Sequence, residues 1–118
     1  ILNFLLGKYS SRLVSISDAM SAAGAGDGEY VIGALDVVVK DGVARLTANN
    51  SLAGSTLTLS RSYDRLVAKE VNIKEISKML STNPATALGT RNLGSIAIGM
   101  KADFVEVTES KFVATLEF

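Results

Sequence analysis

The sequence of 118 residues contains no histidine, no cysteine and no tryptophan, and it has a single proline. Because there is no cysteine, disulfides and thiolate metal sites are excluded, and a small secreted scaffold held by disulfides is not expected. Because there is no histidine, the commonest transition-metal ligand is missing, and neither a Ser-His-Asp triad nor a Cys-His pair can form. We therefore expect no metal ligands from this chain.

Charge and hydropathy exclude further classes of protein. Lys+Arg and Asp+Glu both number 12, so the formal net charge is zero, and no run of five or six like charges occurs. No apolar run approaches the ~20 residues of a membrane-spanning helix, and residues 1–7 lack the basic start and cleavage site of a signal peptide. We expect neither nucleic acid nor a membrane as a partner, and by default a cytoplasmic location.

Length and composition favour part of an α/β fold. The hydrophobic content of 47% suits a buried α/β interior and argues against disorder. The chain is nevertheless too short for a complete (β/α)8 barrel, which typically needs about 250 residues.

The first half of the sequence shows helical and strand patterns in turn. Apolar residues at helical spacing predict the end of an amphipathic helix over residues 2–9. Residues 13–16 form a nearly continuous apolar run, which is typical of a parallel strand covered on both faces. A loop follows over residues 21–28, and Asp41-Gly42 is a strong signal for a two-residue hairpin turn. The strands of this small antiparallel insertion are predicted at residues 30–32, 35–40 and 43–46.

Three helices are predicted next. Apolar residues from Leu59 to Val67 mark the stripe of the first helix. Asn72, followed three residues later by Glu75, forms a start like a capping box for the second. Asn83-Pro84 predicts a cap and a first-turn proline for a short third helix, which Gly89 ends.

The tail changes to strand patterns. Residues 104–107 and 111–118 are separated by Glu109-Ser110, and the second run alternates apolar and other residues with period two. We expect a hairpin with one buried face, which needs a partner sheet that this chain barely supplies.

Asp18 is the first candidate for a functional residue. It stands just after the apolar run of residues 13–16, and barrel enzymes place catalytic groups at the C-terminal ends of their strands. A carboxylate there could take a proton from water and pass it to a leaving amine. The alternative is an aspartate that forms a turn or caps a helix through nearby backbone N–H groups.

The second candidate is the run Leu52-Ala53-Gly54-Ser55-Thr56. Gly54 would allow a ligand to approach the backbone closely, and a helix start favours anionic groups. The alternative is an ordinary helix start with Ser55 or Thr56 as the N-cap, and both can hold together.

The glycine-rich run over residues 24–28 is a weaker candidate. Glu29 stands where a dinucleotide-binding loop needs its third glycine, and no Lys-Ser/Thr follows as a Walker loop requires. A surface loop is the better interpretation. The nearby carboxylates match no calcium-binding spacing and are expected to form a solvated face. They are Asp27, Glu29, Asp36 and Asp41.

Taken in order, these segments resemble the N-acetylglucosamine-6-phosphate deacetylase family of the metal-dependent amidohydrolase superfamily. Residues 14–20 resemble the last barrel strand of the family with its Asp-Ala pair. Residues 27–33 and 41–46 look like its hairpin insertion, and residues 52–55 like its substrate loop. The segments 83–89, 94–96 and 99–103 resemble a signature found more widely in the superfamily, where the chain leaves the barrel for a small β-sandwich.

The resemblance implies a C-terminal fragment with two parts. Residues 1–93 would be the last part of the (β/α)8 TIM-type barrel with its β-hairpin insertion. Residues 94–118 would be strands of the small β-sandwich domain. Ile98 and Met100-Lys101 depart from the usual pattern of the family, in the connection to the sandwich.

The resemblance also implies an activity for the full-length enzyme, which is the removal of acetate from an amino-sugar phosphate, N-acetylglucosamine 6-phosphate. Asp18 would act as general base and then general acid, while Leu52, Ala53 and Gly54 would contact the sugar. A divalent metal, often zinc, would activate water through ligands absent from this chain, and the enzyme would commonly be a homodimer. The isolated chain is expected to be inactive. Two alternatives stay open, which are a cyclic-amide hydrolase of the same superfamily and a noncatalytic α+β interaction module.

Overall fold

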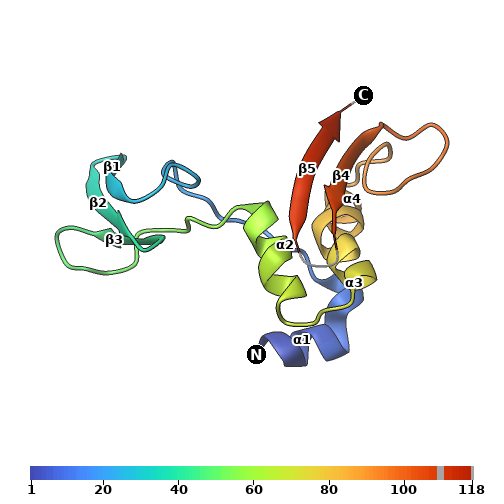
Figure 1. Ribbon diagram of the computed structural model, residues 1–118, viewed down its shortest axis with the longest axis horizontal. Coiled ribbons are helices and arrows are strands. Elements are labelled where there is room, and N and C mark those ends of the chain that lie inside the picture. Colours follow the sequence, from blue (N-terminus) through green and yellow to red (C-terminus); the bar gives the residue numbers. More distant parts are fainter. Residues whose placement is uncertain (109–110, 118) are drawn as a thin grey trace. The chain divides into compact units, whose positions relative to one another are not determined.

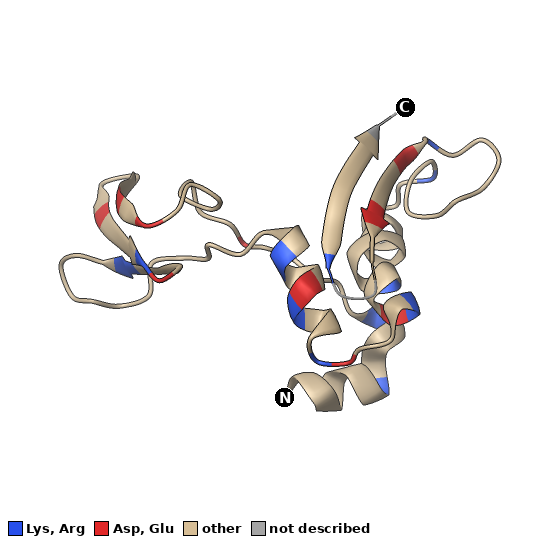
Figure 2. Cartoon of the chain, viewed as in Figure 1, with Lys and Arg blue, Asp and Glu red and all other residues tan. Residues whose placement is uncertain are grey.

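The computed structural model describes residues 1–108 and 111–117. The chain divides into two compact units. We call residues 17–58 the strand unit, and residues 1–16 together with 59–118 the helical unit (Figure 1). Lys and Arg are interspersed with Asp and Glu in both units (Figure 2).

The strand unit contains one antiparallel sheet of three strands in the order β1-β2-β3. Its strands are β1 (Gly28–Ile32), β2 (Leu35–Lys40) and β3 (Val43–Leu46). Asp41 and Gly42 join β2 to β3 with φ angles of 51° and 71°. Two successive positive φ values characterise the type I′ turn, which matches the twist of the strands on either side. The predicted antiparallel strands and their two-residue turn are therefore confirmed.

Small side chains form the core of the strand unit. Val37 and Val39 alternate inward along β2, Ala44 lies opposite Val39 on β3, and Ala22 from the preceding loop is buried against them. Partly buried side chains complete this core: Met20, Tyr30, Ile32, Leu46 and Ala53.

The helical unit is built from α-helices together with a short 3-10 helix and a turn of π-helix, which has a wider turn. Its helical elements are α1 (Leu2–Tyr9), η1 (Ser10–Arg12), α2 (Leu59–Val67), α3 (Ile73–Ser77), η2 (Lys78–Thr82) and α4 (Asn83–Ala87). Large side chains from α2, α3 and η2 form the buried core: Tyr63, Leu66, Ile76 and Met79. The predicted cap of α3 is confirmed, because the Asn72 Oδ1 atom accepts from the Lys74 N–H group at 2.9 Å.

The last two strands, β4 (Asp103–Val107) and β5 (Phe112–Glu117), pair antiparallel. Val107 and Phe112 pack against the core of the helical unit. Two side chains of α2 hold the end of the hairpin. Tyr63 Oη donates to the Thr108 carbonyl at 2.7 Å, and Asp64 Oδ1 accepts from Phe112 N–H at 2.8 Å. The predicted hairpin is confirmed for the described residues, while Glu109, Ser110 and Phe118 lie outside them.

The prediction of a buried parallel strand at residues 13–16 is wrong for this chain. The segment is extended, and Ser15 N–H donates to the Met79 carbonyl at 3.0 Å, but no strand is formed. Val14 is 37% exposed and Ile16 is 68% exposed. A parallel strand is stable between neighbours that cover its edges and faces, and both sheets among the described residues are antiparallel.

Asn83 does not cap a separate helix as predicted. It has helical φ and ψ of −66° and −45°, so α3, η2 and α4 run on from Ile73 to Ala87. Its side-chain Nδ2 instead donates to the Leu13 carbonyl at 2.6 Å and to the Ser10 carbonyl at 3.2 Å. The wider turn of η2 ends at Thr82, two residues before Pro84, which has no N–H group to donate within a helix.

The predicted end of the helix at Gly89 is confirmed. Gly89 has a φ of 68°, its N–H donates to the Thr86 carbonyl, and Thr90 N–H donates to the Ala85 carbonyl. This pair of bonds is the Schellman ending, which needs a residue with positive φ just after the helix.

The helices and small sheets agree with the predicted α/β class. The barrel, the sandwich and the boundary between residues 93 and 94 stay predictions. Among the residues that the structure describes, no helix is both long and apolar enough to cross a membrane.

Candidate functional site

Asp18 lies in the strand unit, at the end of the extended segment, and is exposed to solvent. Its φ of 48° is in the left-handed region, which aspartate tolerates better than most residues. The next residue, Ala19, forms a parallel bridge with Ser55, and Met20 N–H donates to the Ser55 carbonyl at 2.9 Å. Two sequence candidates, Asp18 and the segment that precedes Ser55, are therefore neighbours.

Residues 52–54 run along the outer edge of β3. Leu52 forms an antiparallel bridge with Arg45, and Ala53 N–H donates to the Ala44 carbonyl at 3.0 Å. The two side chains point to opposite sides. Leu52 is 70% exposed, whereas Ala53 packs against the core of the strand unit. An exposed apolar side chain and an edge of backbone are thus available to a ligand.

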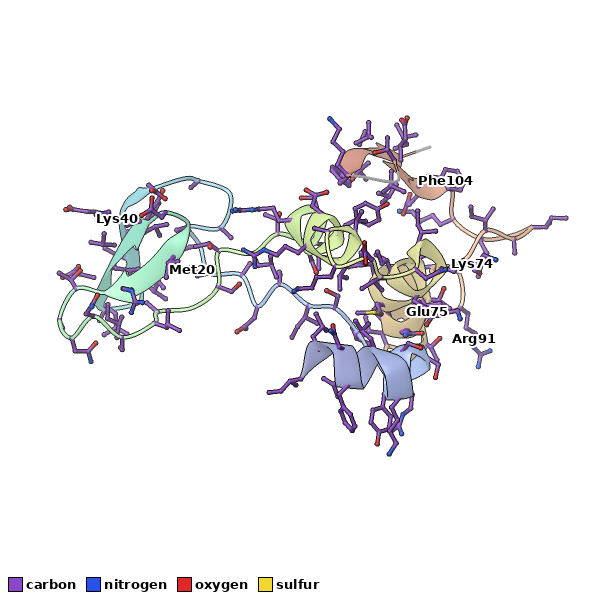
Figure 3. The ribbon with its side chains drawn as sticks, turned by 60° about the horizontal axis from the view of Figure 1, so that its bottom comes forward. Met20, Lys40, Lys74, Glu75, Arg91 and Phe104 are labelled. Atoms are coloured by element: carbon purple, nitrogen blue, oxygen red, sulfur yellow. The ribbon has the colours of Figure 1, made fainter. Side chains whose placement is uncertain are left out.

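Gly54 is favoured by its backbone conformation. Its φ is 114°, and a Cβ atom at this position would lie 3.4 Å from Met20 Cβ and 3.8 Å from Met20 Sδ. Met20 itself packs against the core of the strand unit (Figure 3). The positive φ therefore accounts for the glycine, whereas a Cβ atom would meet Met20 only at ordinary contact distance.

The expected helix start at Ser55 or Thr56 is not formed. Helix α2 begins only at Leu59, so neither hydroxyl occupies its N-cap position. Ser55 Oγ instead accepts from Leu57 N–H at 3.0 Å, and Thr56 Oγ1 donates to the Gly42 carbonyl. Both side chains stabilise the strand unit.

Asp27 has a role that the sequence did not indicate. Its Oδ2 accepts from Asp41 N–H at 2.7 Å and its Oδ1 accepts from Gly42 N–H at 3.0 Å. These bonds from Gly42 and then Asp41, with the charge of Lys40, hold the pKa of Asp27 below its ordinary value. The partners stand fourteen and fifteen residues away, and no local motif marks such a spacing.

The residues present do not by themselves fit a metal ion. Within residues 1–108 and 111–117, no group of three or more Asp or Glu side chains is arranged to hold one, and histidine and cysteine are absent from the sequence. The expectation that metal ligands come from outside this chain concerns residues that the structure does not contain, so it stays a prediction.

Comparison with known proteins gives relatives named as deacetylases of amino-sugar phosphates. The chain is 41% identical over 100 residues to the N-acetylglucosamine-6-phosphate deacetylase of Vibrio furnissii, covering 83% of this chain and 25% of that protein. It is also 41% identical over 96 residues to a putative N-acetylgalactosamine-6-phosphate deacetylase of Escherichia coli K12, covering 80% of this chain and 57% of that protein. The chain thus spans about a quarter of the length of the first relative.

Solved structures agree with the sequence relatives. An N-acetylglucosamine-6-phosphate deacetylase from Thermotoga maritima superposes with a TM-score of 0.83 at 36% identity, over 96% of this chain and 31% of that one. A mutant of the corresponding enzyme from Mycobacterium smegmatis, in complex with N-acetyl-D-glucosamine-6-phosphate, gives 0.80 at 31% identity, over 98% of this chain and 32% of that one. The predicted resemblance is therefore confirmed. Because the Amidohydrolase family profile also matches residues 10–117, the chain belongs to the amidohydrolase family.

Proposed function

We propose that this chain supplies two parts of the site of an N-acetylglucosamine-6-phosphate deacetylase. Asp18 is the proton-transferring group, and the 52–54 segment contacts the sugar. One observation carries the proposal: the Met20 N–H bond to the Ser55 carbonyl, with the bridge from Ala19 to Ser55, joins the two candidate segments within one unit. The deacetylases named above as relatives supply the substrate class.

The chemistry suits an exposed carboxylate on a fixed backbone. In hydrolysis of the acetamido group, water adds to the carbonyl carbon, the C–N bond breaks, and the amine nitrogen gains a proton. Asp18 would accept the proton from the attacking water and return it to the leaving nitrogen, so that one residue serves as base and then as acid. Leu52 would offer an apolar contact, while Gly54 keeps the approach to the backbone open.

The divalent metal that the resemblance implies, zinc included, would need ligands from polypeptide outside this sequence. When bound, such an ion lowers the pKa of water. A lone carboxylate does not achieve this, and we expect the 118-residue chain by itself to release no acetate. Homodimerisation and a cytoplasmic location also remain predictions.

The proposal can be tested in a chimera. The segment of the Vibrio furnissii deacetylase that aligns with this chain is replaced by this chain, and acetate release from N-acetylglucosamine 6-phosphate is measured with the metal of the parent enzyme present. We expect metal-dependent acetate release by the chimera and none by the isolated chain. A chimera that folds and melts like its parent but releases no acetate would refute the proposal.

A second substrate has support from specific relatives. Two proteins from Escherichia coli that match at 41% identity are described as acting on N-acetylgalactosamine 6-phosphate, one of them putatively. The same chimera therefore decides between the two epimeric sugars through the ratio of kcat/KM values. Activity on a cyclic amide in place of both sugars would favour the other amidohydrolase reaction. A chain that shows no activity in any chimera but binds a partner protein would favour the noncatalytic module.

A further inference from the structure

The turn between β2 and β3 is held from two sides by side chains that come from different segments. Asp27, from the loop that follows Asp18, accepts from the Asp41 N–H group at 2.7 Å and the Gly42 N–H group at 3.0 Å. Thr56, which follows the 52–54 segment, donates to the carbonyl of the same Gly42. We call Asp27 and Thr56 the turn clamp.

The turn clamp closes a ring of contacts around the candidate site. The chain itself connects Met20 to Asp27. Hydrogen bonds through Gly42 then connect Asp27 to Thr56, which follows Ser55 in the sequence. The hydrogen bond from Met20 N–H to the Ser55 carbonyl, at 2.9 Å, completes the ring. Asp18 lies two residues before Met20 and Gly54 lies one residue before Ser55, so both adjoin the closing bond. The ring thus includes the bond that joins the two candidate segments, beside the bridge from Ala19 to Ser55.

The covalent side of the ring is itself folded tightly. Ala23 N–H donates to the Met20 carbonyl at 3.0 Å, Ala25 N–H donates to the Ala22 carbonyl at 3.1 Å, and Ala22 is almost completely buried. The covalent link between Met20 and Asp27 is therefore a short segment that is anchored at Ala22 in the core of the strand unit.

We propose that Asp27 and Thr56 are positioning residues, which set the place of Asp18 relative to the 52–54 segment by holding the Asp41-Gly42 turn between them. The functional part of this inference rests on the deacetylase proposed above. Correct geometry at a reacting centre contributes strongly to rate, and small displacements from a distant change are costly. Neither residue touches the substrate in this scheme.

Asp27→Asn is the main variant, because asparagine offers a single acceptor oxygen in place of the two carboxylate oxygens used here. Thr56→Val removes the hydroxyl donor. Thr56→Ser keeps the hydroxyl, so this variant should behave like the unsubstituted chain. Glu29→Gln is the matched control, since Glu29 is an exposed carboxylate on β1. Protected amides of Val37 and Val39 show in each case that the sheet has formed.

The first readout is hydrogen exchange in the 118-residue chain, which needs no activity. We expect Asp27→Asn and Thr56→Val each to speed exchange of the Met20 amide about tenfold, the size of change that loss of a charge-assisted or buried hydrogen bond produces. Thr56→Ser and Glu29→Gln should leave it within about twofold. If only the Asp41 and Gly42 amides respond and Met20 does not, the clamp is local to the turn and the inference is wrong.

The second readout is kinetic and uses the active chimera well below its melting temperature. We expect Asp27→Asn and Thr56→Val each to lower kcat about tenfold, with Thr56→Ser and Glu29→Gln unchanged. The double variant should lose less than the product of the two single losses, because both open the same ring. Unchanged kcat in both single variants would overturn the positioning role. If the unsubstituted chimera is inactive, the deacetylase proposal fails, and the exchange of Met20 alone then decides whether the clamp exists.

Discussion

The strand unit packs small side chains and the helical unit packs large ones. Alanine and valine form the core of the first, whereas Tyr63, Leu66, Ile76 and Met79 form the core of the second. All the candidate site residues, Asp18 and the 52–54 segment, belong to the unit with the small core.

This difference shows how the candidate site is built. In the strand unit, backbone groups of neighbouring segments contact one another directly, as in the bond from Met20 to Ser55 and that from Ala53 to Ala44. Small side chains such as those of Ala44 and Ala53 line these contacts. In the helical unit, large side chains pack between the elements, beside backbone bonds such as that from Ser15 N–H to the Met79 carbonyl. Changes in the helical unit should therefore affect stability, and changes in the strand unit should affect the geometry of the site.

The largest expected effect is the difference in kcat loss between substitutions of two aspartates, one in each unit. In the active chimera, Asp18→Asn should lower kcat by a factor of about 10² to 10⁴, the usual contribution of general acid–base catalysis, with little change in KM. Asp64→Asn is the matched variant of the helical unit, where the carboxylate accepts from Phe112 N–H. It should leave kcat unchanged, and steady-state kinetics on both variants provides the test. Equal kcat losses in the two variants would remove the functional distinction between the units.

The next effect concerns the two cores. Ile76 is completely buried in α3, and Ile76→Ala should cost about 2–5 kcal/mol of the free energy of unfolding. Val37→Ala in the strand unit should cost less free energy of unfolding, because it removes fewer carbon atoms than Ile76→Ala and the core around Val37 is built from smaller side chains. Denaturant unfolding followed by amide exchange in each unit measures both changes. A larger loss for Val37→Ala than for Ile76→Ala would contradict the proposed contrast.

Local signals predicted much of the fold. The Asp41-Gly42 pair predicted the hairpin because its positive φ values suit few other sequences, and Asn72 predicted the start of α3 through its own side chain. Gly89 likewise predicted the helix end. Each of these features is determined by residues within a few positions along the chain.

The failures of prediction share a different cause. Residues 13–16 carry the pattern of a buried strand, yet such a strand depends on neighbours that the described residues do not provide. Asn83 has the sequence of a cap but satisfies carbonyls some seventy residues earlier. For the candidate site, local patterns singled out Asp18 and residues 52–56, and the resemblance to a family supplied their expected roles. Asp27 was missed because its partners are distant in sequence.

A smaller effect tests close packing in the helical unit. Gly94 and Gly99 have similar φ values of 93° and 87°, but a Cβ atom at Gly94 would lie 2.5 Å from Ala85 Cβ, whereas one at Gly99 would meet nothing within 4 Å. Gly94→Ala should therefore cost about 1–3 kcal/mol more than Gly99→Ala, as overpacked sites typically do. Thermal unfolding of both variants supplies the comparison. Equal costs would mean that the contact at Ala85 relaxes freely.

The smallest effect is the pH dependence of the turn clamp. Hydrogen bonds from Gly42 and Asp41 N–H groups lower the pKa of Asp27 in the folded chain below its ordinary value of 3.8. The stabilisation by the carboxylate is thus present above pH 3.8 and is lost as the pH falls through the lowered folded value. Protection of the Asp41 and Gly42 amides, corrected for intrinsic exchange, should fall over that acidic range. The same loss in the Asp27→Asn variant would show that another group is responsible.

The most direct test of the account is whether Asp18 stands beside the 52–54 segment in solution. In a labelled sample of the 118-residue chain, we predict nuclear Overhauser effects between backbone protons of Ala19 or Met20 and those of Gly54 or Ser55, together with slow exchange of the Met20 amide. If cross-strand effects between β2 and β3 show a folded sheet while those between Met20 and Ser55 are absent, the two candidate segments do not form one site and the account is contradicted.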